Sequence, residues 1–252
     1  MLQIYYNSYK ICTFAFENNL CMKIGVITAM SLEHKQIALL LEDKKEFNDG
    51  PFKYIEGKIN NNTIILMKCG IGKVNAASGT TDFIHKFSPD CIISTGVAGG
   101  IDKCLKVMDV VASSNIVYHD VWCGEGNKYG QVQGLPLLFN ANDTLLQTAI
   151  SIDSPTAIHA GLICTGDKFI TSREELDKIK SDFPEGLAVD MESGAIAQVC
   201  HIFDIPFISF RIISDTPGAD NHWDQYTNFW DTIADTSFKV TELFLSAIPN
   251  KL

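Results

Sequence analysis

Three carboxylates stand where the hydrophobic pattern of the chain changes: Glu33, Glu192 and Asp215. Asp215 ends an apolar run that also contains Arg211 and Ser214. Ionisable groups are costly to bury without a partner, and ligands bind at the carboxyl ends of strands in parallel α/β sheets. Cleavage of a glycosidic bond needs such a set, because one carboxylate activates water while a second acid protonates the leaving group.

Each of these residues also has a structural explanation, and the pattern alone leaves both explanations open. An ion pair between Arg211 and Asp215 would cap a strand. Glu33 falls in the first turn of a predicted helix, where an acid complements the helix dipole. Asp190 precedes Glu192 at a change from strand to helix, and it is a candidate N-cap.

Short apolar segments alternate with helical patterns, and this alternation predicts the elements that carry these side chains. We expect an α/β fold in a single domain, with a central mixed β-sheet flanked by helices. Strands are predicted at 22–29, 52–59, 63–69, 91–95, 107–114, 159–165, 206–215 and, turning into a helix that ends at Phe203, 187–193. Further helices are predicted after Gly72, around 145–150, over about 228–248, and after Ser31 and Ser172, which are the predicted caps of their helices. The strands at 52–59 and 63–69 are predicted to form a hairpin that turns at 60–62.

Two glycine-rich segments follow predicted strands. Residues 96–100 contain three glycines and one alanine, which let a backbone approach a ligand more closely than a plain strand exit requires. Gly70-Ile71-Gly72 is part of a dinucleotide-binding motif, but Asn75 occupies the third glycine position. A tight turn with close helix packing explains Gly70 and Gly72 equally well.

The composition is that of a globular protein of 252 residues, 46% of them hydrophobic, with a net charge of −10. This charge disfavours nucleic acid or an anionic membrane as the main partner, and no apolar run is long enough to cross a bilayer. The eight cysteines include no Cys-x-x-Cys pair and no zinc spacing. We therefore expect reduced thiols in a cytoplasmic protein, and no metal or organic cofactor is indicated.

The first 21 residues do not share this pattern. Residues 11–16 are apolar, but only Lys10 precedes them directly and no convincing cleavage site follows. We interpret residues 1–21 as a loosely attached N-terminal extension or as the result of an upstream start codon, with a poor signal peptide as the weaker alternative. The folded domain is expected to span residues 22–252 and to begin at Met22.

Seven segments, taken together, are far more specific than any one of them. They are Met22–Met30 with Glu33, Gly70–Val74, Thr95–Gly100, Tyr118–Asp120, Gly166–Ile170, Val189–Glu192 and Arg211–Asp215. In this order they resemble the 5′-methylthioadenosine/S-adenosylhomocysteine nucleosidases, which belong to the purine nucleoside phosphorylase superfamily. The resemblance runs from Met22 to the last predicted helix and implies the nucleoside phosphorylase-like fold.

The resemblance implies a hydrolase that cleaves the N-glycosidic bond of methylthioadenosine and S-adenosylhomocysteine, releasing adenine and a 5-thioribose in methionine salvage. 5′-Deoxyadenosine and aminodeoxyfutalosine are further substrates that the sequence leaves open. Glu33 would activate the attacking water, and Asp215 would protonate adenine at N7. A desolvated site would favour the protonated form of Asp215, whereas Glu33 must stay ionised.

The same resemblance implies how the sugar is held. Glu192 would bind the ribose hydroxyls, with Met191 packed against the sugar. Val97, Ala98 and Gly99 would line the ribose side.

For the base and the water, the implied residues come from later segments. Phe169 would stack on adenine, and the backbone of Ile170 would read its edge. Ser214 would orient Asp215, and Arg211 would lie near the water and Glu33. Trp223, Tyr226 and Phe229 are candidates to close over the 5′ substituent.

Two positions depart from the family pattern. Val97 replaces a more usual Ser or Thr, and Asp190 replaces a Glu that faces away in the family, so we expect little effect from Asp190. A phosphorylase of the same fold is one alternative, but Ser94 stands where phosphorylases place Arg and Val97 cannot donate to phosphate. A non-catalytic nucleoside-binding protein is the other, and the presence of both Glu33 and Asp215 disfavours it.

Residues 118–136 are rich in glycine and aromatic side chains and lack a helix or strand period. Long irregular segments inside a domain are usually functional or interfacial, and Trp and Tyr are typical of subunit contacts. The resemblance implies a homodimer in which a loop of the partner covers the 5′ side of the site. We predict that residues 122–136 form this loop.

Overall fold

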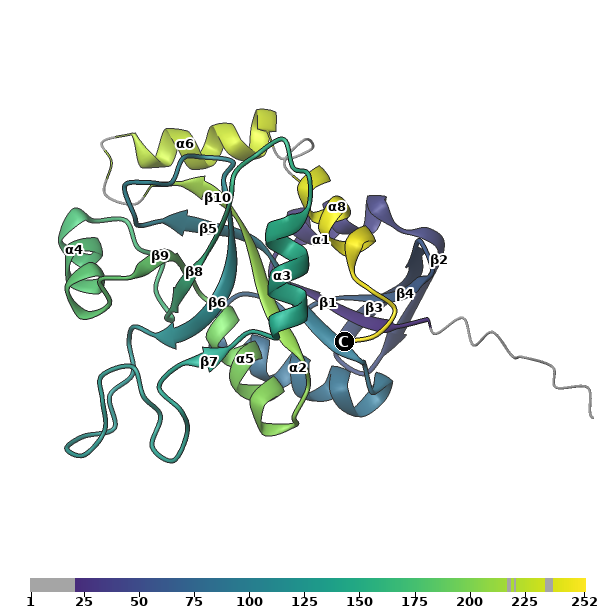
Figure 1. Cartoon of the computed structure of the whole chain (residues 1–252), viewed down its shortest axis with the longest axis horizontal. Helices are drawn as coiled ribbons and strands as arrows, with labels where there is room; N and C mark the ends of the chain where they lie inside the picture. Colours follow the sequence, from purple (N-terminus) through teal and green to yellow (C-terminus); the bar gives the residue numbers. More distant parts are fainter. Residues whose placement is uncertain (1–20, 217–218, 220, 234–237) are drawn as a thin grey trace, which may run out of the picture.

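The computed structural model describes residues 21–216, 219, 221–233 and 238–252, and it confirms the α/β fold with a mixed central sheet flanked by helices (Figure 1). The strands are β1 (Lys23–Thr28), β2 (Glu42–Asp49), β3 (Phe52–Ile59), β4 (Asn62–Lys68), β5 (Cys91–Gly100), β6 (Val110–Tyr118), β7 (Phe139–Asn140), β8 (Ile158–Thr165), β9 (Gly186–Asp190) and β10 (Phe207–Asp215). The helices are α1 (Ser31–Leu40), α2 (Lys73–Phe87), α3 (Asp143–Ser151), α4 (Arg173–Asp182), α5 (Ser193–Ile202), α6 (His222–Asn228), the π-helix η1 (Phe229–Ile233) and α8 (Lys239–Ala247).

Helices cover both faces of the sheet, and the strands alternate their side chains between two cores. In β10, Phe210 and Ile212 pack in the core that includes residues of α1, α3 and α8, whereas Phe207 and Ile213 pack in the core that includes residues of α2 and α5. Figure 1 shows α3 beside α8, and α2 beside α5. Because Arg211 alternates with Phe210 and Ile212, its side chain is directed to the α5 side of the sheet.

Five strands of the sheet close into a ring. β10 pairs with both β5 and β6, β8 pairs with β6 and β9, and β9 returns to β5 through Gly99 and Val189. β1, β4, β3 and β2 extend the sheet outward from β5 in that order. The ring brings the carboxyl ends of β5, β8, β9 and β10 to one rim, and α6 packs against β10 beside it (Figure 1).

Several local predictions are confirmed by the hydrogen bonds of the structure. The hairpin of β3 and β4 turns at 60–62 as expected, and α4 follows its predicted N-cap, because the Ser172 side chain accepts from the Glu175 N–H at 3.3 Å. The predicted cap of α1 is wrong. Ser31 is the first helical residue, Met30 is the N-cap, and the Glu33 side chain accepts from the Met30 N–H.

Several elements differ from the prediction: β5 continues to Gly100 instead of ending at 95, and the short strand β7 is not predicted. Strand β2 is not predicted, because its sequence EDKKEFND is that of a solvent-facing edge strand with little apolar alternation. β6 begins at Val110 rather than at 107, because residues 106–109 form a turn in which the Asp109 carboxylate accepts from the Lys106 N–H at 2.9 Å. The last predicted helix starts earlier, at His222, and changes to π-helix at Phe229, while residues 234–237 lie outside the described part.

The predicted N-terminal extension lies outside the described residues except for Cys21. In the described part of the chain, no helix has both the length and the hydropathy of a membrane span. The cysteines of the described residues are free thiols, as expected from their spacing.

Candidate active site

A cavity of about 380 Å³ opens at the rim of the strand ring. It is lined by Ala29, Met30, Glu33, Ile71, Val97, Ala98, Gly99, Phe169, Val189, Asp190, Met191, Glu192, Ser214, Asp215, Trp223 and Tyr226. All the predicted site residues except Ile170, Arg211 and Phe229 are in this lining. Ile170 lines a smaller adjoining cavity with Phe169 and Asp215, and Arg211 lies beneath the floor with 1% of its surface exposed. Residues separated by most of the chain therefore meet in one cavity.

Glu33 reaches the cavity because the start of α1 bends its side chain back toward the end of β1. Oε2 accepts from the backbone N–H groups of Ala29 at 3.0 Å and Met30 at 2.9 Å, and Oε1 accepts from the Val97 N–H at 3.0 Å. The side chain thus caps its own helix and also presents a carboxylate to the cavity. Both explanations of Glu33 are therefore correct: it caps α1, and its carboxyl group faces the cavity.

Gly96 is the glycine that this arrangement requires. A Cβ at Gly96 would lie 2.3 Å from Glu33 Oε1 and 2.9 Å from a guanidinium nitrogen of Arg211, and the residue has a φ of +146°. Such contacts are closer than any side-chain carbon tolerates, and the φ value favours glycine. Gly96 therefore leaves room for two side chains of the site, a purpose that the glycine-rich pattern alone does not identify.

Ser214 and Asp215 are the last residues of β10, and they line the cavity together with Glu33. Both are buried, and the Ser214 hydroxyl donates to Asp215 Oδ1 at 2.7 Å. The β10–β5 register places Asp215 opposite Gly99, across the end of the strand pair. The ion pair between Asp215 and Arg211, one of the two explanations left open by the sequence, is not formed, because Arg211 lies four residues earlier in β10 and is bound by other acids.

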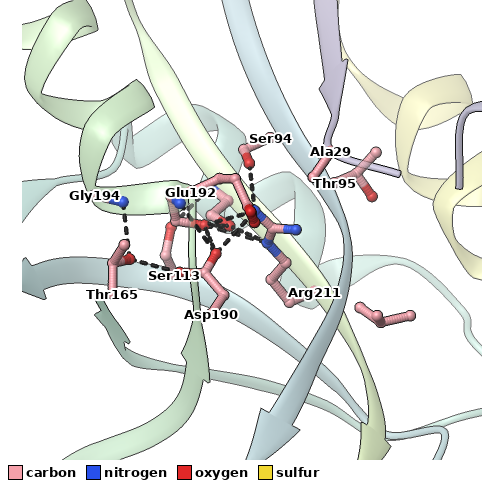
Figure 2. Close-up of polar contacts among 12 residues, drawn as sticks. Ala29, Ser94, Thr95, Ser113, Thr165, Asp190, Glu192, Gly194 and Arg211 are labelled. Atoms are coloured by element: carbon pink, nitrogen blue, oxygen red, sulfur yellow. Dashed lines mark hydrogen bonds and ion pairs between the residues drawn. The ribbon is translucent and has the colours of Figure 1, made fainter. Parts of the chain in front are cut away.

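Arg211 is the centre of a buried polar network (Figure 2). Figure 2 shows its side chain pointing toward Asp190 and Glu192, with Ser94 on the neighbouring strand. Nη2 lies 2.8 Å from Asp190 Oδ2 and 3.8 Å from Glu192 Oε2, and it donates to Ser94 Oγ at 2.9 Å. Ser193, at the start of α5, accepts from both Nε and Nη2.

Asp190 was expected to face away from the site, as the residue at this position does in the family, and this expectation is wrong. Its carboxylate is the nearest acid to Arg211, and it accepts further hydrogen bonds from Thr165 Oγ1 at 2.6 Å and from the Ser193 N–H and hydroxyl. The predicted capping bond at the start of α5 is present, but it is only one contact among several. Arg211, Thr165 and Ser193 thus surround the Asp190 carboxyl group with donors, which satisfies its oxygens in the buried site.

Burial makes the ionised forms of the remaining acids costly. It raises the pKa of Glu33, while Arg211 and the N–H groups of Val97, Met30 and Ala29 lower it. Burial also raises the pKa of Glu192 to about 7; Asp190 adds to this shift, whereas Arg211 opposes it. The Glu192 carboxyl accepts one close hydrogen bond, from the Gly72 N–H at 2.9 Å.

An aromatic wall stands over one side of the cavity. Phe169 is 41% exposed, and its ring centroid lies 5.6 Å from those of Trp223 and Tyr226. Trp223 and Tyr226 line the cavity as predicted for the tail of the chain. Phe229 does not, because it is fully buried in the core with α3 and α8.

Five lining residues were missed by the sequence reasoning, although each belongs to a segment that it singled out: Ala29, Met30, Ile71, Val189 and Asp190. The missing signal is geometric, because apolar or capping residues become lining residues only when strand ends from distant segments meet. Val97 was predicted to line the ribose side, but its main contribution is different. Its side chain packs partly against the core, and its N–H donates to Glu33.

Other chemistry has little support among the described side chains. They contain no group of three or more His, Cys, Asp or Glu residues placed to hold a metal ion. Cys69 lies near the acids, but burial raises its pKa to about 12, which keeps the thiol protonated.

Comparison with known proteins gives consistent matches over almost the whole described domain. The model of the phosphorylase superfamily matches residues 23–246. A 5′-methylthioadenosine/S-adenosylhomocysteine nucleosidase of Actinobacillus succinogenes is 43% identical over 197 residues, which cover 77% of this chain and 86% of the relative. The crystal structure of such a nucleosidase from Colwellia psychrerythraea in complex with adenine has a TM-score of 0.84 and 34% identity, over 92% of this chain and 98% of that one. Futalosine hydrolase of Helicobacter pylori has a TM-score of 0.82 and 28% identity, over 90% and 98%.

The buried Glu192 carboxyl predicts a specific dependence of stability on pH. Its pKa is about 7 in the folded protein against 4.5 for a free Glu, so the folded state binds the extra proton between these values. The free energy of unfolding should therefore fall as the pH rises through this window, by up to about 3 kcal/mol from this group. Glu192→Gln should remove that fall.

Urea unfolding of the wild type, Glu192→Gln and the exposed control Glu174→Gln, at about pH 5 and about pH 8, measures this difference. We expect the stability of Glu192→Gln relative to the wild type to increase with pH, and that of Glu174→Gln to stay constant. A constant offset for Glu192→Gln at both pH values would contradict the raised pKa.

Proposed function

The chain belongs to the phosphorylase superfamily and, within it, to the 5′-methylthioadenosine/S-adenosylhomocysteine nucleosidases, and we infer that it hydrolyses the N-glycosidic bond of these two nucleosides. The products are adenine and a 5-thioribose, which fits a place in methionine salvage. One observation carries the inference: Glu33 and Asp215, which are 182 positions apart, line the same cavity together with the side chains that could hold a nucleoside.

We propose that Asp215 is the general acid. Adenine is a poor leaving group as an anion, so a ring nitrogen, N7, must gain a proton as the bond from C1′ to N9 breaks. The Asp215 carboxyl is buried at the cavity wall, where Ser214 donates to its Oδ1 and so orients the group toward the base. The electron pair of the broken bond then remains on a neutral adenine.

Glu33 is the general base in this proposal. Three N–H groups and the nearby Arg211 guanidinium favour its carboxylate form against the effect of burial. Water between Glu33 and C1′ loses a proton to the carboxylate as its oxygen attacks the sugar carbon. The carbon becomes oxocarbenium-like in this step, and the carboxylates around it stabilise the developing positive charge.

We assign binding of the sugar to the residues between the end of β9 and the start of α5. Glu192 is the carboxyl that faces the ribose hydroxyls, and Met191 packs against the ring. The ends of β5, at Ala98 and Gly99, line the same cavity, and Val97 supplies an N–H to Glu33 rather than a hydroxyl to the sugar.

The base is held by the loop that follows β8. The half-exposed ring of Phe169 is available for stacking on adenine, and stacking on an aromatic ring is favourable for any purine. Ile170 lines the adjoining small cavity beside Asp215, so its backbone can read the edge of the base near N7. Trp223 and Tyr226 continue this wall toward the 5′ position.

The charges of the site favour water over phosphate as the nucleophile. A phosphorylase needs a positive side chain that faces the ribose, but Arg211 is 1% exposed and already bound by Asp190 and Ser94. Of the described residues, none with a positive side chain lines the 380 Å³ cavity. A non-catalytic nucleoside-binding protein would not need the two acids, so this alternative is also disfavoured.

Methylthioadenosine incubated with and without inorganic phosphate tests the reaction type. We expect adenine and free methylthioribose in phosphate-free buffer at a rate that phosphate does not change, because water is the nucleophile. Both products can be separated and quantified by chromatography, and 5′-deoxyadenosine and aminodeoxyfutalosine can be assayed in the same way. A requirement for phosphate, with a sugar phosphate as product, would refute the hydrolase.

Asp215→Asn tests the role of the general acid. The amide keeps the size of the side chain and the contact with Ser214, but it cannot give a proton to N7. We expect a fall in kcat of about 100-fold or more, the usual contribution of a positioned acid, with the Kd of a substrate analogue changed by less than about threefold. Unchanged kcat would remove Asp215 from this role.

We propose that the active protein is a cytoplasmic homodimer formed by residues 22–252. Ile71, Val74 and Trp122 support the dimer, because they are 53%, 76% and 63% exposed apolar side chains on two segments that the Lys73–Asp120 ion pair joins. A partner loop from residues 122–136 would then cover the 5′ side. The net charge of −10 is compatible with a small nucleoside and disfavours nucleic acid or a membrane surface as a partner.

Deletion of residues 1–21 tests the proposed domain and its assembly together. The shortened chain should retain kcat and KM within about twofold, since β1 begins at Lys23 and the site uses nothing before Ala29. Sedimentation should give the mass of two chains for both forms. Loss of activity on deletion would contradict the domain boundary, and a monomer with full activity would contradict the dimer.

A further inference from the structure

Three of the sequence segments that identify the family contain charged residues with no part in the proposed reaction: Lys73, Asp120 and Asp167. The structure brings them together beside the active site. Lys73 Nζ lies 2.8 Å from both carboxylate oxygens of Asp120 and 3.9 Å from Asp167 Oδ2. We call these three residues the clamp. None of them lines the cavity of the active site.

On one side, the clamp fixes the loop that carries Phe169. The Asp167 N–H donates to Asp120 Oδ2 at 2.8 Å, and the Asp167 carboxylate accepts from the Lys73 N–H at 2.7 Å. This N–H is the first of α2, where the helix dipole favours a carboxylate. Asp167 precedes Phe169 by two residues, so the clamp holds the backbone and the side chain of a residue close to the aromatic ring.

On the other side, the clamp is continuous with the residue proposed to bind ribose. Gly72 precedes Lys73, and its N–H donates to Glu192 Oε1 at 2.9 Å. A Cβ at Gly72 would lie 3.1 Å from Asp167 Oδ1, and Gly72 has a φ of +92°, so the turn and the Asp167 side chain are in close contact. One turn of backbone therefore binds Glu192 through one N–H and Asp167 through the next.

Close packing leaves the loop little freedom to take another path. His119 is 8% exposed, and its ring would lie 2.4 Å from a Cβ at Gly166. The His119 N–H also donates to the Thr165 carbonyl at 2.9 Å, which extends the pairing of β6 with β8 to the base of the loop. The segment of Asp120 and the loop of Phe169 thus begin from the same pair of strand ends.

We propose that Lys73 and Asp120 are positioning residues for nucleoside binding, which hold the base-stacking loop of Phe169 at a fixed distance from Glu192. This proposal rests on the proposed function, because the nucleoside is the ligand that must span from Phe169 to Glu192. The clamp acts through Asp167 and Gly72 and does not touch the substrate. Its loss should therefore weaken binding of the base while the acid and the base of the reaction remain in place.

The alternative is that Lys73 and Asp120 form an ordinary surface ion pair that affects only stability. The same helix contains a second ion pair that serves as a matched control. Lys86 and Asp82 lie at the other end of α2, 2.9 Å apart, with side chains that are 22% and 29% exposed against 23% and 29% for Lys73 and Asp120. Both lysines also stand over a tyrosine ring, at 5.3 Å for Lys73 and 5.4 Å for Lys86. If only stability were involved, the two lysines should behave alike.

Kinetics of Lys73→Met, Lys73→Arg and Lys86→Met on methylthioadenosine, with the Kd of adenine from calorimetry, separate these cases. For Lys73→Met we expect KM and the adenine Kd to rise about tenfold, the effect of losing one charge-assisted hydrogen bond, with kcat within about threefold of the wild type. Lys73→Arg keeps the charge and can bind both oxygens of Asp120, so it should restore both constants to within about threefold. Lys86→Met should change neither constant by more than about twofold.

Equal KM and adenine Kd values for Lys73→Met and Lys86→Met would overturn the proposal, and so would a fall in kcat with both constants unchanged. If Lys73→Met does not fold, Asp120→Asn, which keeps the size of the side chain, takes its place with the same expected rise. Failure of the proposed function would appear separately, as absence of hydrolysis by the wild type. In that case the adenine Kd alone decides whether the clamp positions the loop of Phe169.

Discussion

One buried cation holds the polar centre of this protein together. The Arg211 guanidinium, almost fully removed from water, lies between Asp190, Glu192 and Glu33, and its closest contact is Asp190 at 2.8 Å. A buried ion pair adds little net stability, but removing one partner leaves an uncompensated charge that costs several kcal/mol. Asp190 is therefore the main counter-ion of Arg211. Glu192, whose Oε2 lies 3.8 Å from Arg211 Nη2, interacts with the guanidinium more weakly. For Glu33 and Glu192, burial raises the pKa and the Arg211 charge lowers it, so this one cation acts on both of these carboxyl groups.

The strand ring determines where this charge can be placed. Since β10 pairs with β5 on one side and β6 on the other, Arg211 and Asp215 lie on a strand without a free edge. Glu33 comes from outside the ring, through the first turn of α1, and reaches Arg211 over Gly96. Three local features thus bring distant side chains to the same cavity. They are the helix cap at Glu33, the positive φ of Gly96 and the alternation of side chains along β10.

Much of the fold could be predicted because local chemistry agrees with the final structure. The apolar run that becomes β10, the hairpin of β3 and β4 and the Ser172 cap each have a signal within a few residues. The role of Asp190 could not be predicted in this way, because its partners Arg211 and Thr165 lie 21 and 25 residues away in sequence and meet it only when β8, β9 and β10 share a rim. Strand β2 and the π-helix at Phe229 were missed for a related reason: an edge strand and a change of helix type depend on neighbours more than on composition.

The central claim is that Glu33 and Asp215 act from opposite sides of one glycosidic bond. A crystal structure of the Asp215→Asn variant with bound methylthioadenosine tests it most directly, since this variant should bind the nucleoside without cleaving it. We expect the side chain at position 215 within hydrogen-bond distance of N7, and Glu33 on the far side of C1′ with a water molecule between them. A nucleoside bound outside the 380 Å³ cavity, or one with both side chains on the same side of the bond, would contradict the claim.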